Sequence, residues 1–141
     1  MAKNFHLEIV TPDRSVYSGD PYSLIVPAYE GTLGVMAGHA PLLCTLQPGL
    51  LTIRVEGSVV EMSISSGFME VSPKGVIILA DAVERLEDID VQRAEDSLDR
   101  AKKRLASPDE SLDYARAESD RLRAENRLRL GLRHKEGRKG P

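Results

Sequence analysis

Short apolar runs separated by turn residues fill the first part of the chain. The runs lie at residues 5–10, 15–17, 23–27, 33–36, 42–46, 50–56, 59–65, 68–71 and 76–80. Glycine or proline stands at most of the boundaries between them, where tight turns require a positive or a fixed φ. Because helical periodicity is absent, this spacing predicts eight to ten short strands in an antiparallel sandwich or barrel.

Two patterns indicate how these strands are buried. Val60, Met62 and Ile64 alternate with polar residues, which is typical of a strand with one face in a core. Residues 76–79 are apolar at every position. This strand is therefore expected to be central in its sheet or to be covered on its second face, and the C-terminal part of the chain is the expected cover.

After residue 82 the composition changes abruptly to Asp, Glu, Arg and Ala, and Pro108 is the only strong breaker before Gly131. Such a composition predicts helix. Apolar residues at alternating spacings of three and four form one stripe along a first helix: Val91, Ala94, Leu98, Ala101 and Leu105.

A second helix is predicted to begin at residues 107–110, which supply an N-cap Ser, a Pro at the first helical position and a capping-box Glu. Its predicted seam has two polar members among five: Leu112, Ala115, Ser119, Leu122 and Asn126. A buried Leu contributes about 1.5 to 3 kcal/mol and an Ala much less. The helical hairpin is therefore expected to be weakly held and easily dislodged.

These patterns divide the chain into three parts. We predict a β-sandwich domain over residues 1–86 and an α-helical hairpin over residues 87–133. From Gly131 onward glycine and basic residues accumulate, so residues 134–141 are predicted to be a flexible tail.

Charge is distributed unevenly over the 141 residues. Residues 1–87 hold 5 Lys/Arg against 10 Asp/Glu, whereas residues 88–141 hold 14 against 12. The C-terminal end is strongly basic, but it lacks interleaved aromatic residues and lies on a helix rich in carboxylates. Nucleic acid is therefore not an expected partner.

The sequence gives little support for an enzymatic function. Cys44 is the only cysteine, so an intrachain disulfide and a Cys/His metal cluster are both excluded. The histidines His6, His39 and His134 fall in a strand edge, a turn and the tail, and none has a nucleophile beside it. His39 either forms a hydrogen bond that fixes a tight loop, which is the favoured interpretation, or presents its imidazole to a partner. No apolar run approaches the roughly 20 residues of a membrane span.

Three segments together resemble the epsilon subunit of F-type, proton-translocating ATP synthases. Residues 31–42 (GTLGVMAGHAPL), followed by residues 46–49 (LQPG), are similar to the most characteristic loop of that family. Residues 66–71 (SGFMEV) resemble its strand after a small-residue turn, with one glycine where the family usually has two. Residues 79–82 and 87–90 resemble its junction into the helices, so the match runs over essentially the whole chain.

The resemblance implies a ten-stranded antiparallel β-sandwich followed by a two-helix antiparallel hairpin. It implies a non-catalytic rotor subunit of the central stalk that couples proton-driven rotation to ATP synthesis. The implied partners are the gamma subunit, the membrane rotor ring of c subunits and the catalytic alpha/beta head, with membrane contact through the complex alone. The contacts implied for gamma and the ring are Glu30, Gly31, Thr32, Gly38, His39 and Pro41.

In this family the hairpin either folds against the sandwich or extends into the catalytic head, where it blocks ATP hydrolysis. The residues expected to contact the head in the extended state are all basic: Arg121, Arg123, Arg127, Arg129 and Arg133. This behaviour agrees with the weak seam predicted from the residues.

Some bacterial members also bind ATP as a regulatory ligand, and no cofactor is required. Residues 89–94 (IDVQRA) satisfy their motif in full, which singles out Ile89, Asp90, Arg93 and Ala94. Further positions of that site have matching residues at Glu84, Arg100, Arg123 and Arg127. The arginines of each helix recur on one face and could meet a triphosphate together.

Simpler structural explanations stand beside the nucleotide site. Asp90 would cap the first helix, Asp96 would pair with Arg100, and Arg123 and Arg127 would belong to a solvated or gamma-facing stripe. The alternative for the whole chain is a free-standing nucleotide-sensing or protein-interaction β-domain. The complete cluster and the long helical end resemble bacterial members more, so we expect a peripheral position at the cytoplasmic face of a bacterial cell membrane.

Overall fold

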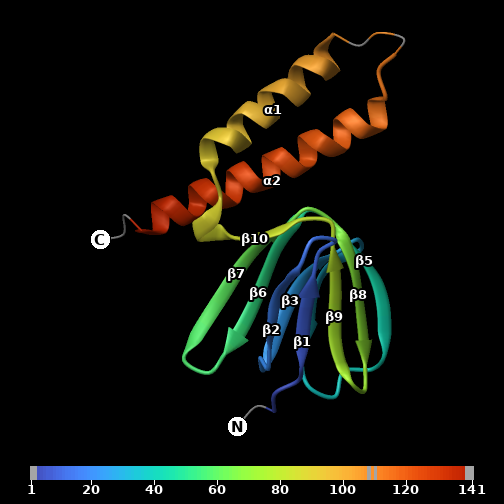
Figure 1. Ribbon diagram of the computed structural model, residues 1–141, viewed down its shortest axis with the longest axis vertical. Coiled ribbons are helices and arrows are strands. Elements are labelled where there is room, and N and C mark those ends of the chain that lie inside the picture. Colours follow the sequence, from blue (N-terminus) through green and yellow to red (C-terminus); the bar gives the residue numbers. More distant parts are fainter. Residues whose placement is uncertain (1–2, 108, 110, 139–141) are drawn as a thin grey trace. The chain divides into compact units, whose positions relative to one another are not determined.

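The computed structural model describes residues 3–107, 109 and 111–138. The chain forms two compact units, Met1–Arg85 and Leu86–Pro141. The first unit is built from strands and the second from helices (Figure 1).

Ten strands form the first unit. Their bounds are β1 Leu7–Val10, β2 Ser15–Gly19, β3 Ser23–Ala28, β4 Gly31–Val35, β5 Leu42–Leu46, β6 Gly49–Val55, β7 Ser58–Ile64, β8 Gly67–Ser72, β9 Gly75–Ala80 and β10 Val83–Arg85. One layer of the sandwich has the order β10-β7-β6-β3-β4 and the other has the order β5-β8-β9-β1-β2. A single pair of residues, Ala28 and Leu46, joins β3 to β5 and so connects the layers.

Alternation along the strands builds one aliphatic core between the layers. Leu7 and Ile9 of β1, Met69 and Val71 of β8, and Ile78 of β9 are buried, while their immediate neighbours along each strand are more exposed. The predicted ten-stranded sandwich with a helical hairpin is therefore confirmed. One pairing departs from the antiparallel pattern, because β1 runs parallel to β9.

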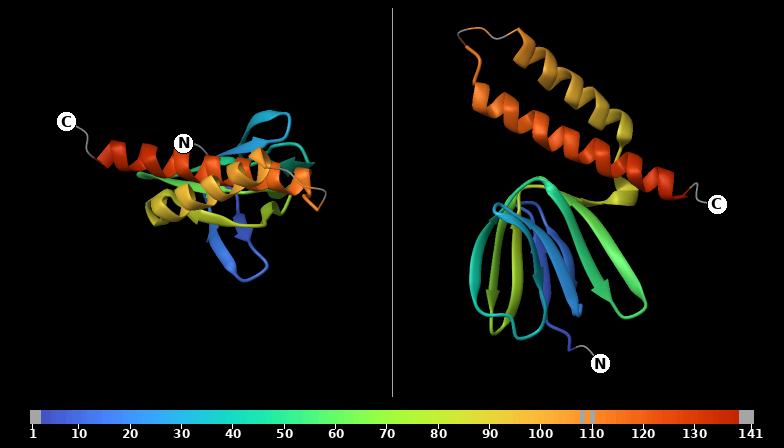
Figure 2. Two further views of the ribbon diagram at one scale, coloured as in Figure 1. Left: turned by 90° about the horizontal axis from the view of Figure 1, so that it is seen from above. Right: turned by 180° about the vertical axis from the view of Figure 1, so that it is seen from behind.

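The second unit is a helical hairpin (Figure 2). A short 3-10 helix, η1 Leu86–Asp88, precedes α1 Val91–Ala106 and α2 Tyr114–Arg138. The predicted stripe of α1 is confirmed, because Ala94, Leu98 and Ala101 are buried. Among the described residues no helix combines the length and the apolar character that crossing a membrane requires.

The start of α2 differs from the prediction. Asp109 accepts hydrogen bonds from the Ser111 backbone N–H (2.8 Å) and hydroxyl (2.6 Å), which form a local turn instead of a helix start. Asp113 then accepts from the Arg116 N–H at 3.1 Å and caps α2 six residues later than the predicted N-cap. Pro108 and Glu110 of the predicted start lie outside the described residues.

The predicted seam of α2 had the wrong phase. Ala115 and Leu122 are exposed, although Asn126 of the same predicted stripe is buried. The buried face instead carries Ala117, Ala124, Leu130 and Gly131. Small side chains allow two helices to approach closely, and this close approach outweighed the larger hydrophobic area that Leu122 would have contributed.

Helix α2 also continues where a tail was expected, so His134 belongs to a helix. A Cβ atom on Gly131 would lie 2.9 Å from Ile89 Cγ2 and 3.0 Å from Val91 Cγ2. Glycine costs about 1 kcal/mol relative to alanine inside a helix. Close packing against the start of α1 offsets this cost, and residues 139–141 lie outside the described part of the chain.

We predict that Gly131→Leu destabilises the hairpin by about 1 to 3 kcal/mol, because the new side chain must displace two stiff branched residues. Gly137→Leu is the matched control, since a Cβ there meets nothing within 4 Å. The control should be neutral or stabilising by a few tenths of a kcal/mol. Urea unfolding followed by far-UV circular dichroism measures both, and equal losses at the two glycines would contradict the packing argument.

Candidate functional site

An apolar face covers the outer side of the layer that contains β5, β8 and β9. Strand register places Leu43 opposite Glu70 and Glu70 opposite Ile77, and it aligns Thr45, Phe68 and Leu79 in the next row. The large apolar members remain exposed: Leu43 (71%), Phe68 (55%), Ile77 (43%) and Leu79 (56%). These four residues are the outer apolar face. Adjacent exposed apolar groups of this kind mark interaction sites.

Sequence reasoning did not assign this face a function. The signal was present in residues 76–79, which are apolar at every position. Strand β9 is indeed central, between β8 and β1, yet Ile77 and Leu79 point away from the core. The contributions of Leu43 and Phe68 required knowledge of the register, which no single strand reveals.

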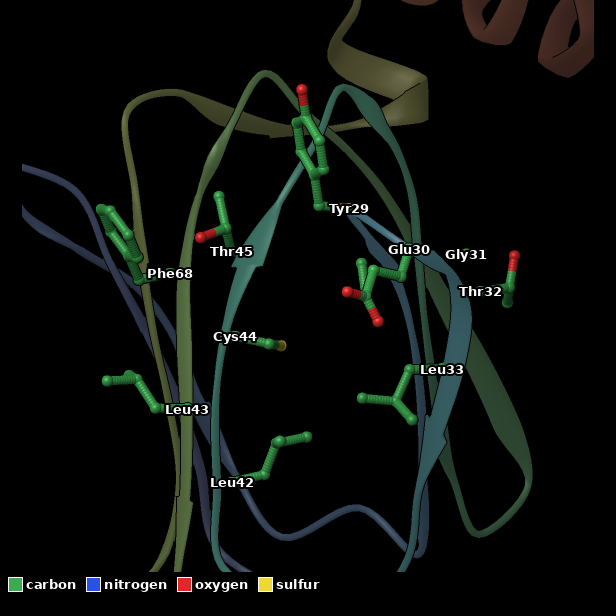
Figure 3. Close-up of a pocket in the computed structure, with 11 residues that line it drawn as sticks. Tyr29, Glu30, Gly31, Thr32, Leu33, Leu42, Leu43, Cys44, Thr45 and Phe68 are labelled. Carbon is green, nitrogen blue, oxygen red and sulfur yellow. The ribbon is translucent and has the colours of Figure 1, made fainter.

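A cleft of about 890 Å³ lies beside this face, between β4 and β5 (Figure 3). Of the six residues predicted to contact gamma and the ring, Glu30, Gly31 and Thr32 line it. The remaining lining residues are all uncharged: Ala28, Tyr29, Leu33, Leu42, Leu43, Cys44, Thr45 and Phe68. Partial burial raises the pKa of the Cys44 thiol, so the sulfur stays protonated and acts as an apolar group.

The other three predicted contacts, Gly38, His39 and Pro41, lie in the connection between β4 and β5. Gly38 adopts a φ of +83°, which favours glycine. His39 donates from Nδ1 to the Ala40 carbonyl at 2.7 Å, which supports the favoured interpretation of a loop-fixing histidine. Gly38 and His39 line a separate pocket of about 230 Å³ together with Lys74.

Several residues of the predicted nucleotide cluster have structural roles at the start of α1. Asp90 is the N-cap and accepts from the Arg93 N–H at 3.1 Å, so the capping explanation for Asp90 is confirmed. Ile89 and Ala94 are buried. Asp96 accepts from Gln92 at 3.1 Å, while Arg100 donates to the Ser97 hydroxyl at 3.1 Å.

The hairpin register brings the predicted arginines to matching levels. Gly131 lies against Ile89 and Val91 at one end, and Arg104 pairs with Asp120 at 3.1 Å toward the other. Antiparallel helices with these contacts place Arg100 level with Arg123. They place Arg93 within one turn of Arg127.

Arg123 carries the least satisfied polar group of the cluster. Its Nε atom is buried and has no hydrogen-bond partner among the described residues. Arg127 is half-buried, and Arg93 and Arg100 are exposed. Glu84 belongs to the first unit, on β10, where it pairs opposite Ser63. Within the described residues no three His, Cys, Asp or Glu side chains are grouped to hold a metal ion.

The basic residues expected to reach the catalytic head are partly engaged within α2. Arg121 pairs with Glu118 and, at 2.6 Å, with Glu125. The hydrogen bond from Arg121 lowers the pKa of the Glu118 carboxyl. Arg129 donates to the Asn126 side chain at 3.1 Å, and Arg133 is exposed.

We predict that Asp90→Ala lowers the stability of the hairpin by about 0.5 to 2 kcal/mol, because the first turn of α1 loses its capping acceptor. Asp90→Asn keeps an acceptor oxygen and should retain most of that stability. Thermal unfolding of both variants, monitored by helical circular dichroism, tests the role of the cap. Equal midpoints for Ala and Asn would mean that the cap contributes nothing.

The models of two protein families match successive parts of the chain. The family described as "ATP synthase, Delta/Epsilon chain, beta-sandwich domain" matches residues 4–86. The family described as "ATP synthase, Delta/Epsilon chain, long alpha-helix domain" matches residues 87–130.

Individual proteins agree with these matches. The ATP synthase epsilon chain of Nitratidesulfovibrio vulgaris is 43% identical over 130 residues, which is 92% of this chain and 97% of the relative. That of Moorella thermoacetica is 44% identical over 127 residues, which is 89% of this chain and 95% of the relative.

Solved structures give the same result. A chain in the OSCP/F1/c-ring part of the Euglena gracilis mitochondrial ATP synthase superposes with a TM-score of 0.78 and 28% identity, covering 94% of this chain and 82% of its own length. A chain in the central stalk and c-ring of the Tetrahymena thermophila mitochondrial ATP synthase shares the fold, with a TM-score of 0.63, 17% identity, and 92% and 94% coverage.

Proposed function

The chain belongs to the ATP synthase delta/epsilon family, as the sequence resemblance predicted, and from this premise we propose how its parts serve the enzyme. It is an epsilon subunit of the central stalk, a non-catalytic component. The proposal has three parts: a rotor attachment through the sandwich, inhibition of ATP hydrolysis through the hairpin, and ATP sensing by the hairpin.

The outer apolar face, together with the cleft beside it, is proposed to attach the sandwich to gamma and the rotor ring. The exposure of Leu43, Phe68, Ile77 and Leu79 is the single observation that carries this part. Glu70 lies between Leu43 and Ile77 in the strand register, so a basic residue on the partner would complement its charge. The sandwich then transmits rotation, and the complex holds it at the cytoplasmic face of a bacterial membrane.

We predict that Phe68→Glu weakens binding to the purified cognate gamma subunit about thirtyfold, the effect of losing an aromatic hot spot. Val59→Glu is the matched control, because Val59 is equally exposed but lies on β7 in the other layer. It should bind within about twofold of wild type, since a residue outside the interface contributes little. Surface plasmon resonance provides both affinities, and equal losses for the two variants would remove the face from the interface.

Release of the hairpin from its folded form is proposed to inhibit ATP hydrolysis. The contacts between α1 and α2 support this part, because their seam consists mainly of Ala94, Ala101, Ala117, Ala124 and Gly131. Alanine buries little apolar area, so opening the two helices costs less than it would with a leucine seam. The exposed ion pair between Arg104 and Asp120 adds less than about 1 kcal/mol.

ATP is proposed to bind the folded hairpin and keep it from inhibiting. Two observations support an anion at this position: Arg100 and Arg123 lie at matching levels, and the buried Nε of Arg123 has no partner among the residues that the structure describes. If ATP binds only the folded form, a concentration of ten times Kd adds about 1.4 kcal/mol of stability. That added stability shifts the equilibrium toward the folded hairpin roughly tenfold, which is enough to control whether a weakly packed hairpin opens.

Isothermal calorimetry of the isolated chain tests the nucleotide part. We predict saturable heat with millimolar ATP and a loss of about tenfold or more in affinity for Arg93→Ala, because a charge-assisted contact to phosphate is removed. Arg116→Ala is the control, since Arg116 is exposed on α2 near the opposite end of the hairpin. Absence of heat, or equal affinities for both variants, would refute ATP binding at this cluster.

A further inference from the structure

We propose that the cleft between β4 and β5 receives an extended segment of a partner protein, which adds a strand to the free edge of β5. This inference rests on the proposed attachment to the stalk and specifies its chemistry. The segment is apolar on the side that faces the cleft and carries a basic residue at the Glu30 end.

The two walls of the cleft are edges of different layers. Strand β4 pairs with β3, and β5 pairs along its length with β8. Between β3 and β5 the only paired residues among the described strands are Ala28 and Leu46. Beyond that corner the layers diverge, and Figure 3 shows Leu33 and Leu42 pointing into the space between them.

Backbone direction shows which groups of β5 are available. The Thr45 carbonyl accepts from the Tyr29 N–H at 2.9 Å, on the side away from β8. In an antiparallel pair alternate residues direct both backbone groups to the same side. The N–H and C=O of Leu43 therefore point toward the cleft, as does the N–H of Thr45. A partner strand can bond to these groups without disturbing the pairing with β8.

The edge of β5 also lacks the usual protection against pairing. Exposed edges are normally shortened, charged, bulged or interrupted by proline. Two other edges of the sandwich follow this rule: β10 has three residues including Glu84 and Arg85, and β2 pairs with β1 through a bulge. The sequence of β5, LLCTL, contains neither a charge nor a proline. An edge left open in this way fits a strand that is covered in the assembled complex.

The lining determines the character of the occupant. Leu33, Leu42 and Cys44 are half-buried apolar groups, and Glu30 is the only charged side chain among the lining residues. Five residues of β5 correspond to an edge of roughly 17 Å. An extended segment of about five residues with a cation at one end matches this length and charge. The cleft is also continuous with the outer apolar face, because both include Leu43 and Phe68.

Hydrogen exchange is the direct test. The full-length chain is bound to its cognate F1 assembly from which this subunit has been removed, and amide exchange is compared with the free chain. The N–H groups of Leu43 and Thr45 should exchange about tenfold or more slowly in the complex, because each gains a backbone hydrogen bond. Alkylation of Cys44, the only thiol, by N-ethylmaleimide should slow as well. Unchanged exchange at both amides in a formed complex overturns strand addition.

A proline substitution tests the same point by affinity. Thr45→Pro removes the N–H that faces the cleft. It keeps the backbone carbonyl at position 45 and the hydrogen bonds between β5 and β8. It should weaken binding to the depleted F1 assembly about tenfold, whereas Thr45→Ala should stay within about twofold. Equal affinities of the two variants, each with a wild-type unfolding midpoint, refute the proposed bond.

The outcomes separate this inference from the proposed function. Binding with unprotected amides leaves the stalk attachment intact and removes strand addition alone. Failure of the wild-type chain to bind the depleted assembly removes both. Protection of Leu43 and Thr45 in the free chain together with a dimer in light scattering would make a second copy the occupant, which contradicts a partner strand.

Discussion

The sandwich depends on one corner, where the chain passes from one layer to the other between β5 and β6. The Gln47 N–H donates to the Pro27 carbonyl at 2.9 Å, and the Gln47 side chain donates to the Ala28 carbonyl at 3.1 Å. Gly49 follows, where a Cβ would lie 2.5 Å from that of Pro27, so only glycine fits without movement. This corner ties β3 to β5, and beyond it β4 and β5 separate. The cleft therefore exists because of this connection.

Sequence patterns predicted the parts of the fold that depend on local repetition. Alternation at residues such as Met62 and Ile64 identified strands, and the regular stripe through Ala94, Leu98 and Ala101 identified α1 with its correct face. The apolar pattern did not predict strand β10, because it has only three residues and two of them are charged, so no alternation is visible. The phase of α2 was wrong because Leu122 is the larger hydrophobic residue, whereas close approach of two helices selects small ones. Propensity could not reveal that choice, since it depends on the facing helix.

The candidate sites also differ in how much of each the sequence could predict. The contacts drawn from the family resemblance fell into two places, with Glu30 in the cleft and His39 in a separate loop pocket. The outer apolar face depends on cross-strand register, which a single sequence does not display. Asp90 illustrates a third case, because one residue satisfies a motif and also caps a helix. Its presence in the motif therefore carries less information about nucleotide binding than Arg123 does, whose buried Nε has no hydrogen-bond partner within the described part of the chain.

The parallel pairing of β1 with β9 has a consequence for biosynthesis. Strand β1 begins at Leu7, but its partner in the centre of the layer ends at Ala80, so the two meet only after most of the sandwich has been made. Contacts so distant in sequence form slowly, and domains usually fold in the order of synthesis. The sandwich can then close only as the helical segment begins to emerge from the ribosome. The β-sandwich is thus completed first, and the helical hairpin is added to a folded body.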